Sequence, residues 1–336
     1  MTAKNSEWES AVEQATGWCH FIQVDVWADI RSQFSWPARK LTLQLPGREV
    51  PLICYSRSTK AFGKLHYIPK LARVQPAEVT EFTDELRKKV GKGLAVRLEL
   101  DQPEDEKMHK ALLKAGWQKA PHIQYDTTVL IDLNRSPEEI YAGFKTRARW
   151  EISAAGRRGT VVKEVPATPE NLKKLYDMMH LTAQRANFRN RSEDFSMKYW
   201  KAYAEAGQGF LYFAEHEGDL LSAAYIIKVG KRAFYKDSGS IRAKQNVFAS
   251  RLLQWQVMQD MHAAGCTVYD MVGVPRSTNN DPSYKGVGTF KTAFGEPTDL
   301  QGSYMLPLSK TKYKVWQKLE PKLMMAYIKL TNNVWY

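Results

Sequence analysis

Cysteine is scarce in this sequence, and the few copies stand far apart. The 336 residues include only Cys19, Cys54 and Cys266, with no CxxC pair and no histidine cluster beside them. Isolated cysteines of this kind indicate reduced structural thiols in a cytoplasmic protein, and they argue against a zinc site.

Long apolar stretches are also missing. No run of about 18 apolar residues occurs, and the N-terminal MTAKNSEWESAVEQ lacks the apolar core of a signal peptide. The sequence therefore predicts a protein that is neither secreted nor membrane-spanning.

Several catalytic signatures are absent as well. The seven histidines show no HExxH or paired spacing, and the sequence contains no GxSxG, no GxGxxG and no P-loop. No cysteine has a plausible base near it in the sequence. These absences speak against metal-dependent, covalent, nicotinamide and ATP chemistry.

Positive charge and apolar residues, in contrast, are plentiful. Lys and Arg number 49 against 36 Asp and Glu, which gives a net charge of +13. Such an excess favours polyanionic partners such as RNA, nucleotide diphosphates or an anionic membrane face, although general solubility is an alternative reading. A chain of this length with 43% hydrophobic residues fits two domains better than one.

The most informative stretch runs from 267 to 295, as TVYDMVGV, the polar loop PRSTNNDPSYK and then GVGTFKTAFG. A helical pattern that closes at Gly265 precedes it, so the apolar run is expected to be a buried strand of a parallel βα layer. Ligands of open α/β sheets gather beyond the carboxyl ends of strands, which predicts that the loop forms a wall of the site. The glycines around Phe290 and Lys291 would let the backbone approach a ligand while one ring and one cation point inward.

These residues carry a family resemblance. YDMVGV, its loop and GVGTFKTAFG resemble the C-terminal signature of the FemABX family, the aminoacyl-tRNA-dependent ligases that add amino acids to the stem peptide of peptidoglycan precursors. A second block, QYDTTVLIDLNRSPEEIYAGFKTRARWEISAAGRRGTVV at 124–162, resembles the family's link into its second domain. With a weaker match at the N-terminus, the resemblance covers most of the chain.

The resemblance implies an α/β (α+β) fold of two tandem GNAT-like acyltransferase domains, with a cleft between them and no long coiled-coil insertion. The first domain is expected at 1–136, completed by a C-terminal helix at 302–336, and the second at 137–301. An internal repeat supports this arrangement, because both halves follow the order meander, helix, glycine, strand.

The resemblance also suggests residues at the transfer site. Lys291 matches a family lysine near the tRNA end, and we expect it to stabilise the negative charge that develops on the reacting carbonyl oxygen. Phe290 would stack on the terminal adenosine of the tRNA, with a buried core phenylalanine as the alternative.

Other residues are expected to bind the acceptor substrate. Arg31, on one helical face with Gln23 and Trp27, takes the place of a family lysine that contacts the precursor's diphosphate, although an ordinary surface arginine is the alternative. Arg191 and Phe195 fit the spacing of an arginine and a ring against the precursor phosphates. Three more substrate-binding residues are expected along the cleft: Tyr235, which would end a strand, Asp270 and Tyr284.

Glu99 matches an acid that the family tends to carry at the end of a first-domain strand. A carboxylate there would accept a proton from the attacking amine, which makes Glu99 a second catalytic candidate. Asp101 and Glu104 are equally placed, and a solvated strand end explains all three without catalysis.

Two basic segments have two readings each. A helix is expected from the capping box at Ser136 through 159, and its five cations suggest either a footprint for the tRNA backbone or a solvated helix face. The tail at 310–336 mixes lysines with aromatic and aliphatic residues. It would either lie on an anionic membrane or pack back on its own domain.

The acyl donor is suggested by a missing motif. Acetyl-CoA-dependent acyltransferases carry glycines in the turn that corresponds to 240–252, where backbone amides wrap the pyrophosphate. Here Asn246 stands at the first glycine position, although Ala249 could pass for the second. We therefore expect no coenzyme A, and no other cofactor or metal.

The combined hypothesis is an aminoacyltransferase in which a stem-peptide amine attacks the ester carbonyl of aminoacyl-tRNA. The acceptor would be UDP-MurNAc-pentapeptide or lipid II, and the protein would act as a monomer in the cytoplasm or peripherally at the membrane's cytoplasmic face. Two alternatives stay open: an N-acyltransferase with another donor, tRNA or acyl-CoA, and a non-catalytic module that binds RNA or the precursor.

Overall fold

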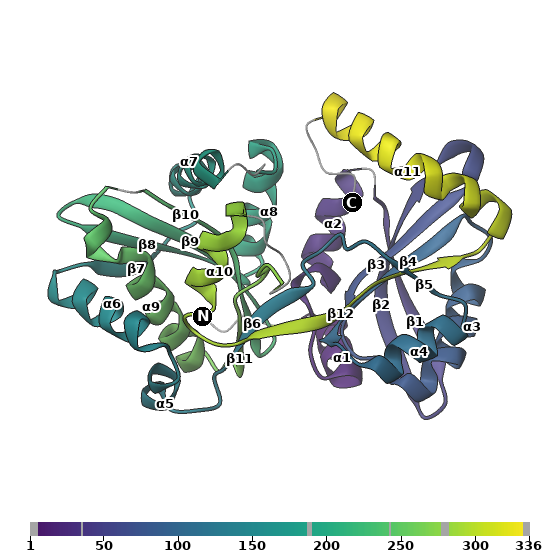
Figure 1. Cartoon of the computed structure of the whole chain (residues 1–336), viewed down its shortest axis with the longest axis horizontal. Helices are drawn as coiled ribbons and strands as arrows, with labels where there is room; N and C mark the ends of the chain where they lie inside the picture. The colour runs from purple at the N-terminus through teal and green to yellow at the C-terminus, as the bar shows by residue number, and fades with distance from the viewer. Residues whose placement is uncertain (1–5, 35, 187–189, 242, 277–281, 332–336) are drawn as a thin grey trace. The chain divides into compact units, whose positions relative to one another are not determined.

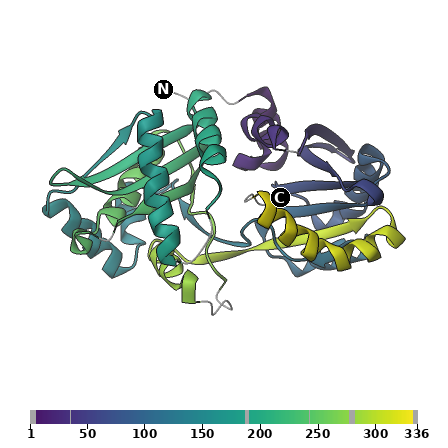
Figure 2. The same ribbon diagram turned by 90° about the horizontal axis from the view of Figure 1, so that it is seen from above.

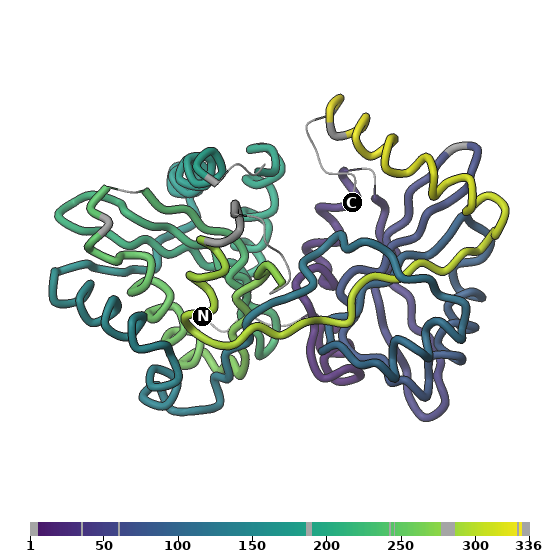
Figure 3. Tube along the Cα trace, in the orientation of Figure 1, coloured from purple at the N-terminus to yellow at the C-terminus, as the bar shows by residue number. Residues whose placement is uncertain are grey.

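The structure is a computed structural model that describes residues 6–34, 36–186, 190–241, 243–276 and 282–331. The chain forms two compact units, which we call the first unit (Asn5–Asp126 with Asp299–Tyr336) and the second unit (Thr127–Thr298). Figure 1 shows both, and Figure 3 follows the chain as it returns to the first unit after residue 298. The domain bounds expected from the sequence, at 136/137 and 301/302, stay a prediction.

The sheet of the first unit has the strand order β1-β2-β3-β4-β12, with β5 paired to β12. Its strands are β1 (Ala38–Leu45), β2 (Arg48–Ser58), β3 (Lys64–Leu71), β4 (Ala95–Pro103), β5 (Gln118–Ala120) and β12 (Pro297–Pro307). The predicted antiparallel meander is confirmed, with Leu41 opposite Leu52 and Tyr55 opposite Tyr67. β3 and β4 then run parallel, which requires the crossover helix between them.

The structure describes five helices and three 3-10 turns in the first unit. They are α1 (Glu7–Thr16), α2 (Asp25–Gln33), α3 (Val79–Val90), α4 (Glu106–Lys114) and α11 (Lys310–Thr331), with 3-10 turns η1 (Phe21–Gln23), η2 (Lys60–Phe62) and η3 (Pro76–Glu78). A capping box begins α1, because Ser6 Oγ accepts from the Glu9 amide at 3.2 Å and Glu9 accepts from the Ser6 amide. Apolar residues of α3 such as Phe82 and Leu86 meet the sheet in a fully buried core.

The C-terminal helix α11, yellow in Figure 2, packs on its own unit. Trp316 is 1% exposed, and its ring centroid lies 5.6 Å from that of Phe62. Leu319, Leu323 and Met325 remain exposed farther along the helix. The packed-back reading of the tail is therefore confirmed for its first half. Among the described residues, no helix has the length and apolar character needed to cross a membrane.

The sheet of the second unit has the order β6-β11-β10-β9-β8-β7. Its strands are β6 (Thr127–Asp132), β7 (Val161–Val165), β8 (Gly209–His216), β9 (Asp219–Val229), β10 (Arg232–Ser240) and β11 (Val268–Asp270). The meander β8-β9-β10 is antiparallel, as predicted. β11 lies parallel to β10 but antiparallel to β6, so the expected parallel layer exists on one side of this strand only.

The helices of the second unit are α5 (Pro137–Ala142), α6 (Thr146–Arg157), α7 (Pro169–Ala186), α8 (Glu193–Glu205), α9 (Ala249–Ala263) and α10 (Pro282–Lys291), with the 3-10 turn η4 (Gln245–Val247). The prediction of one helix from Ser136 to 159 is wrong. Lys145 adopts an extended conformation between α5 and α6, and its amide donates to the carbonyl of Ala293 at 2.9 Å. Gly143, the C-cap of α5, and this bond across the fold therefore divide the expected helix in two.

Both units share one sequence of connections. An antiparallel meander of three strands leads through a helix, α3 or α9, to a strand that lies parallel to the meander's last strand. In the described part of 166–208, the helices are 18 and 13 residues long, so this region contains no long coiled-coil insertion. The repeated order agrees with the internal duplication expected from the sequence.

Candidate functional site

Two cavities adjoin each other in the second unit, beside α10. Their volumes are about 720 Å³ and about 230 Å³. Both are lined by Ser240 at the end of β10, Ser250 in the first turn of α9, and Gly286 and Phe290 of α10. The strand end and the helix start therefore face α10 across a continuous hollow, which we call the α10 cavity.

Lys291, the last residue of α10, lines the smaller part of this cavity. Its Nζ donates to the carbonyl of Gly273 at 3.0 Å and also to that of Val272, just beyond the carboxyl end of β11. Burial lowers the pKa of Lys291 to about 8, although the carboxylates of Asp270 and Asp237 act in the opposite direction. The structure thus brings Lys291, from the glycine-flanked segment, to the end of β11.

The backbone at this strand end is unusual. Val272 has a φ of 47°, in the left-handed region that β-branched residues rarely adopt, and Gly273 follows with a φ of 48°. In this backbone conformation the carbonyls of Val272 and Gly273 both accept from the ammonium group of Lys291. Strained backbone of this kind tends to occur at functional sites.

Tyr235 lies under Lys291, with the lysine Nζ 5.4 Å from the ring centroid. It is 7% exposed and lines the smaller part of the α10 cavity, and burial raises its pKa to about 12. The expectation that Tyr235 ends its strand is wrong, because β10 continues to Ser240. A bulge between Tyr235 and Asp237 shifts the register at this point.

Phe290 is half-buried and lines both parts of the α10 cavity. Its ring packs on the core, with a centroid distance of 5.7 Å to Phe294. Phe290 therefore packs on the core and also forms part of the cavity wall. Stacking on an adenosine stays a prediction.

Arg251 was not singled out in the sequence, yet it holds Phe290 in place. Its guanidinium carbon lies 4.4 Å from the centroid of the Phe290 ring, and Nη1 donates to the Phe290 carbonyl at 2.7 Å. Glu151 accepts from Arg251 Nε at 2.7 Å and from Arg147 Nε at 2.9 Å. The partners of Arg251 are far away in the sequence, so no local pattern marks it.

Lys236 and Asp237 form a second group that the sequence did not reveal. Lys236 Nζ lies 3.0 Å from Asp237 Oδ1, and Trp200 Nε1 donates to the other carboxylate oxygen at 2.9 Å. Burial lowers the pKa of Lys236 and raises that of Asp237, and the positive charges of Arg191 and Lys291 lower both. A polar pair with shifted pKa values therefore lies within the electrostatic reach of Lys291.

Arg191 and Phe195 contact each other. The guanidinium carbon of Arg191 lies 4.9 Å from the ring centroid of Phe195, which is 2% exposed. Neither residue lines the α10 cavity. Their contact with precursor phosphates stays a prediction, and the side chain of Tyr284 lies outside the described residues.

Asp270 is fully buried, and its carboxylate is bonded inside the fold. It forms an ion pair with Arg232 at 2.6 Å, accepts from the Thr128 hydroxyl, and accepts from the Val272 amide at 2.8 Å. These bonds connect β10, β6 and the strained strand end. The structure thus gives Asp270 a clear positioning role, while the expected substrate contact stays a prediction.

The candidates in the first unit are buried too. Glu99 lies inside β4 at 4% exposure and accepts from the amides of Ile123 and Gln124 and from the Tyr67 hydroxyl. The alternative of a solvated strand end is wrong for Glu99, because β4 extends beyond it to Pro103. Asp101, at 2% exposure, is buried as well.

Arg31 lies in α2 and is 7% exposed, so the alternative of an ordinary surface arginine is wrong. Gln23 precedes this helix in η1, and its side chain bonds the backbone of Ile53. Gln23, Trp27 and Arg31 were expected on one helical face. All three are buried, but Gln23 lies outside α2. A contact between Arg31 and a diphosphate stays a prediction.

Three arginines in and just after α6 donate hydrogen bonds to oxygen atoms of the second unit. Arg149 donates to the Ala142 carbonyl at 2.7 Å, Arg157 to the Ser153 hydroxyl, and Arg158 to the Asn246 carbonyl. These bonds point in several directions around the helix. A footprint for tRNA on this helix stays a prediction.

The turn before α9 differs from a pyrophosphate cradle. Lys244 and Phe248 occupy left-handed conformations with φ of 52° and 56°, and the Val247 amide donates to the Lys244 carbonyl at 2.9 Å. Phe248, which caps α9, packs edge-to-face against Trp150, with the ring centroids 5.4 Å apart. Among the described residues of this turn, the amides of Val247 and Arg251 bond the local backbone and Phe248 carries a side chain at the start of the helix, so we derive no step through coenzyme A.

The chain is similar to known acyltransferases in sequence and in fold. The Acetyltransferase (GNAT) domain family matches residues 142–286. The lipid II:glycine glycyltransferases of Staphylococcus epidermidis and Staphylococcus aureus are 20% identical to this chain, over 93% of it and 94% of their own length. The crystal structure of FemX aligns with a TM-score of 0.80 at 17% identity, over 95% of this chain and 99% of that one.

The FemABX resemblance is confirmed. The C-terminal domain of a putative lysylphosphatidylglycerol synthetase from Agrobacterium fabrum shares the fold more loosely, with a TM-score of 0.52 at 13% identity over 95% of this chain and 98% of that one. The predicted fold class, tandem GNAT-like domains of mixed α/β structure, is confirmed by the FemX alignment and the GNAT match. The FemABX-like chain is accordingly an acyltransferase, as expected.

Proposed function

We propose that this FemABX-like protein transfers an amino acid from aminoacyl-tRNA to the stem-peptide amine of a peptidoglycan precursor, and so builds the interpeptide bridge. The observation that carries the proposal is the placement of Lys291, held at the end of β11 and facing the α10 cavity. The staphylococcal relatives described above are named lipid II:glycine glycyltransferases.

In this reaction the amine attacks the ester carbonyl that joins the amino acid to the tRNA. A carbon–nitrogen bond forms, the carbon–oxygen bond to the ribose breaks, and the amine's proton leaves with the ribose hydroxyl or through solvent. Negative charge develops on the carbonyl oxygen before the ribose departs. An ammonium fixed in advance stabilises that charge without reorganisation.

Lys291 suits this role because of its hydrogen bonds. An ammonium has three donors, and the carbonyls of Val272 and Gly273 accept two of them. The third donor is then directed by the first two, which fixes the cation in place. The ring of Tyr235 lies 5.4 Å from the ammonium and lines the same part of the cavity.

The donor is inferred from the turn before α9 and from the charge of the chain. Lys244 and Phe248 carry side chains where a pyrophosphate would need bare amides, whereas a net charge of +13 suits a polyanion. Phe290 offers a ring at the cavity wall for the terminal base, and Arg251 keeps that ring in position.

The acceptor in this proposal is UDP-MurNAc-pentapeptide or lipid II, with Arg31 and Arg191 on its phosphates. We infer that the reaction takes place at the cytoplasmic face of the membrane, where charged tRNA is available. The exposed apolar residues of α11, among them Leu323 and Met325, would support peripheral contact with lipid.

The proposal is tested with purified protein, tRNA charged with a labelled amino acid, and either UDP-MurNAc-pentapeptide or lipid II. A mass increase of the muropeptide by one amino acid residue supports the proposal. Transfer from acyl-CoA would contradict the assignment of the donor. Binding of both substrates without any mass change would support a non-catalytic module instead.

A further inference from the structure

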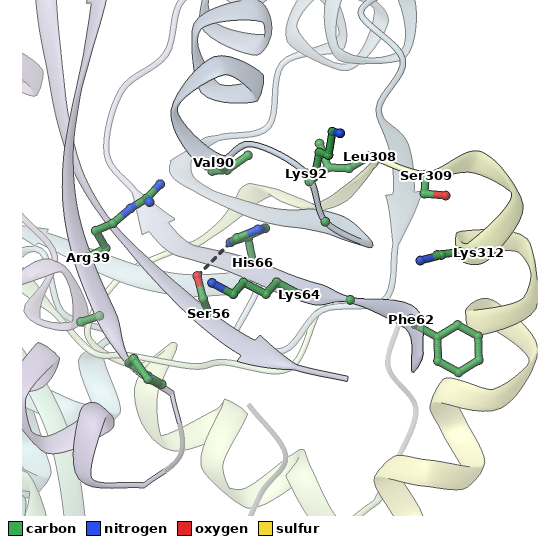
Figure 4. A pocket seen from close by; sticks show the side chains of 14 residues that line it. Arg39, Ser56, Phe62, Lys64, His66, Val90, Lys92, Leu308, Ser309 and Lys312 are labelled. Atoms are coloured by element: carbon green, nitrogen blue, oxygen red, sulfur yellow. Dashed lines mark hydrogen bonds between the residues drawn. The ribbon is translucent and has the colours of Figure 1, made fainter. Parts of the chain in front are cut away.

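Another cavity, of about 770 Å³, lies entirely within the first unit. It is bounded by the start of β1, the end of β2, the start of β3, the turn before β4 and the first turn of α11. Figure 4 shows its lining side chains. None of the residues expected to take part in acyl transfer lines it.

Positive charge surrounds this cavity. Arg39, Lys64, Lys92 and Lys312 line it, and they come from four different segments of the unit (Figure 4). Among the described residues, no acidic side chain lines the cavity or forms an ion pair with any of these four. Such a concentration of unneutralised cations around one hollow favours an anionic ligand.

A buried histidine reinforces this reading. His66 is 3% exposed and lines the cavity, and its Nδ1 lies 2.8 Å from the hydroxyl of Ser56. Its Nε2 has no hydrogen-bond partner among the described residues. Buried polar atoms in native proteins are normally satisfied, so a ligand group is the expected partner of this nitrogen.

The ring of His66 is neutral, because burial together with the charges of Arg39 and Lys64 lowers its pKa to about 4. When the Ser56 hydroxyl donates to Nδ1, the ring proton resides on Nε2, which then acts as a donor. The glycine at position 93 leaves room beside this buried nitrogen. A Cβ at residue 93 would come within 3.1 Å of His66 Nε2 and 2.9 Å of the Lys64 carbonyl.

The remaining lining has two further properties. Phe62, Val90 and Leu308 give the cavity an apolar wall, which an inorganic ion alone would not use. Ser309 and Lys312 belong to the start of α11, a helix of 22 residues whose N-terminal dipole favours anions. The volume lies within the range of small-molecule sites.

We propose that this cavity is a binding site for a small phosphorylated organic molecule of nucleotide size, separate from the α10 cavity. Its phosphate group contacts Lys64, Lys312 and His66 Nε2 at the start of α11. Its organic part lies against Phe62 and Leu308. The concave shape favours this ligand over an extended RNA backbone, which would need an open groove.

The test compares binding by two double variants with calorimetry. Lys64→Ala/Lys312→Ala removes two cations from the cavity, whereas Lys310→Ala/Lys314→Ala removes two exposed lysines of α11 that do not line it. The probes are UMP, UDP, inorganic phosphate, uridine and a short single-stranded RNA. We expect saturable binding of UMP or UDP to the wild type and the control, at least tenfold weaker in the cavity variant.

Each other outcome has a clear meaning. Equal affinity of the two double variants, or no saturable binding of UMP or UDP to the wild type, would overturn the proposal. If inorganic phosphate binds as tightly as UMP, the assigned organic part is wrong. If RNA alone binds and loses affinity in the cavity variant, the site serves a nucleic acid backbone, and the small-molecule assignment is wrong.

Discussion

The ammonium of Lys291 donates to the carbonyl of Gly273 across a distance of 3.0 Å. This bond joins the last residue of α10 to the carboxyl end of β11, two segments that are separated by a polar loop in the sequence. It fixes one positive charge at the wall of the α10 cavity. The proposed chemistry depends on this charge.

Replacement of Lys291 by Met should lower the rate of transfer by at least about 100-fold, because one preorganised donor to a developing oxyanion contributes about that much. The folded state should change little, since the lost hydrogen bonds are offset by relief of a buried charge. Steady-state kinetics and thermal unfolding measure the two effects. Lys201→Met, at an exposed lysine of α8, is the control and should transfer normally. Wild-type rates in Lys291→Met would remove this lysine from the mechanism.

The pH dependence of the reaction should reflect the pKa of Lys291, about 8. Below that pH the ammonium is charged and active, and as the pH rises through 8 it loses its proton, so kcat should fall. Lys291→Arg should move this alkaline fall to higher pH, because a guanidinium keeps its proton. An unchanged alkaline limb in the arginine variant would assign the titration to another group.

The same shift predicts a change in stability. The pKa of this lysine is lower in the folded state than its ordinary 10.5, so between about pH 8 and 10.5 the unfolded chain binds more protons. The contribution of Lys291 to the free energy of unfolding should therefore rise with pH in this window. Urea unfolding at pH 7.5 and 10 tests this, with Lys291→Met as the reference that lacks the increase.

Arg251→Met should lower the free energy of unfolding by about 2 kcal/mol, because it leaves the buried Glu151 with only the exposed Arg147 as a partner. A double-mutant cycle with Glu151→Gln should show that the two effects are not additive. Arg135→Met, which breaks an exposed pair with Asp132, is the matched control and should cost less than about 0.5 kcal/mol. Equal losses in both variants would mean that burial of the Arg251 pair is energetically unimportant.

Two glycines of the signature segment should respond in opposite ways to alanine. A Cβ at Gly295 would meet Ile131 Cδ1 at 2.9 Å and Val129 Cγ1 at 3.0 Å, so Gly295→Ala should destabilise the protein by about 1 to 3 kcal/mol. A Cβ at Gly286, inside α10, meets no atom of the described residues within 4 Å, so Gly286→Ala should stabilise by about 0.5 to 1 kcal/mol. Denaturant unfolding gives both values, and the same sign for both would contradict this account.

Much of the fold was predictable because its signals are local. Alternating apolar residues marked the meanders of β1–β3 and β8–β10, and the capping boxes at Ser6 and Ser136 marked two helix starts. Gly265, with a φ of 79°, marked the end of the helical pattern before β11. Each of these signals lies within a few neighbouring residues.

The candidate site was predictable only in part. Lys291 and Phe290 could be found because the signature segment carries them together. Arg251 could not be found, because its partners Glu151 and Phe290 are brought to it only by the packing of α6, α9 and α10. The shifted pKa values of Lys236 and Asp237 arise from burial, which depends on distant parts of the chain and is not visible in a short sequence pattern.

The sequence by itself determined the strands, most helix starts, the surplus of positive charge and the residues of the signature segment. The tertiary structure decided which polar groups are buried and what they bond. It placed Glu99 and Asp270 among backbone amides and an arginine, and within the described parts of the chain it left His66 Nε2 without a partner. The physical reason is that burial and hydrogen bonding depend on segments that meet only in the folded chain, whereas turns, caps and alternation depend on adjacent residues.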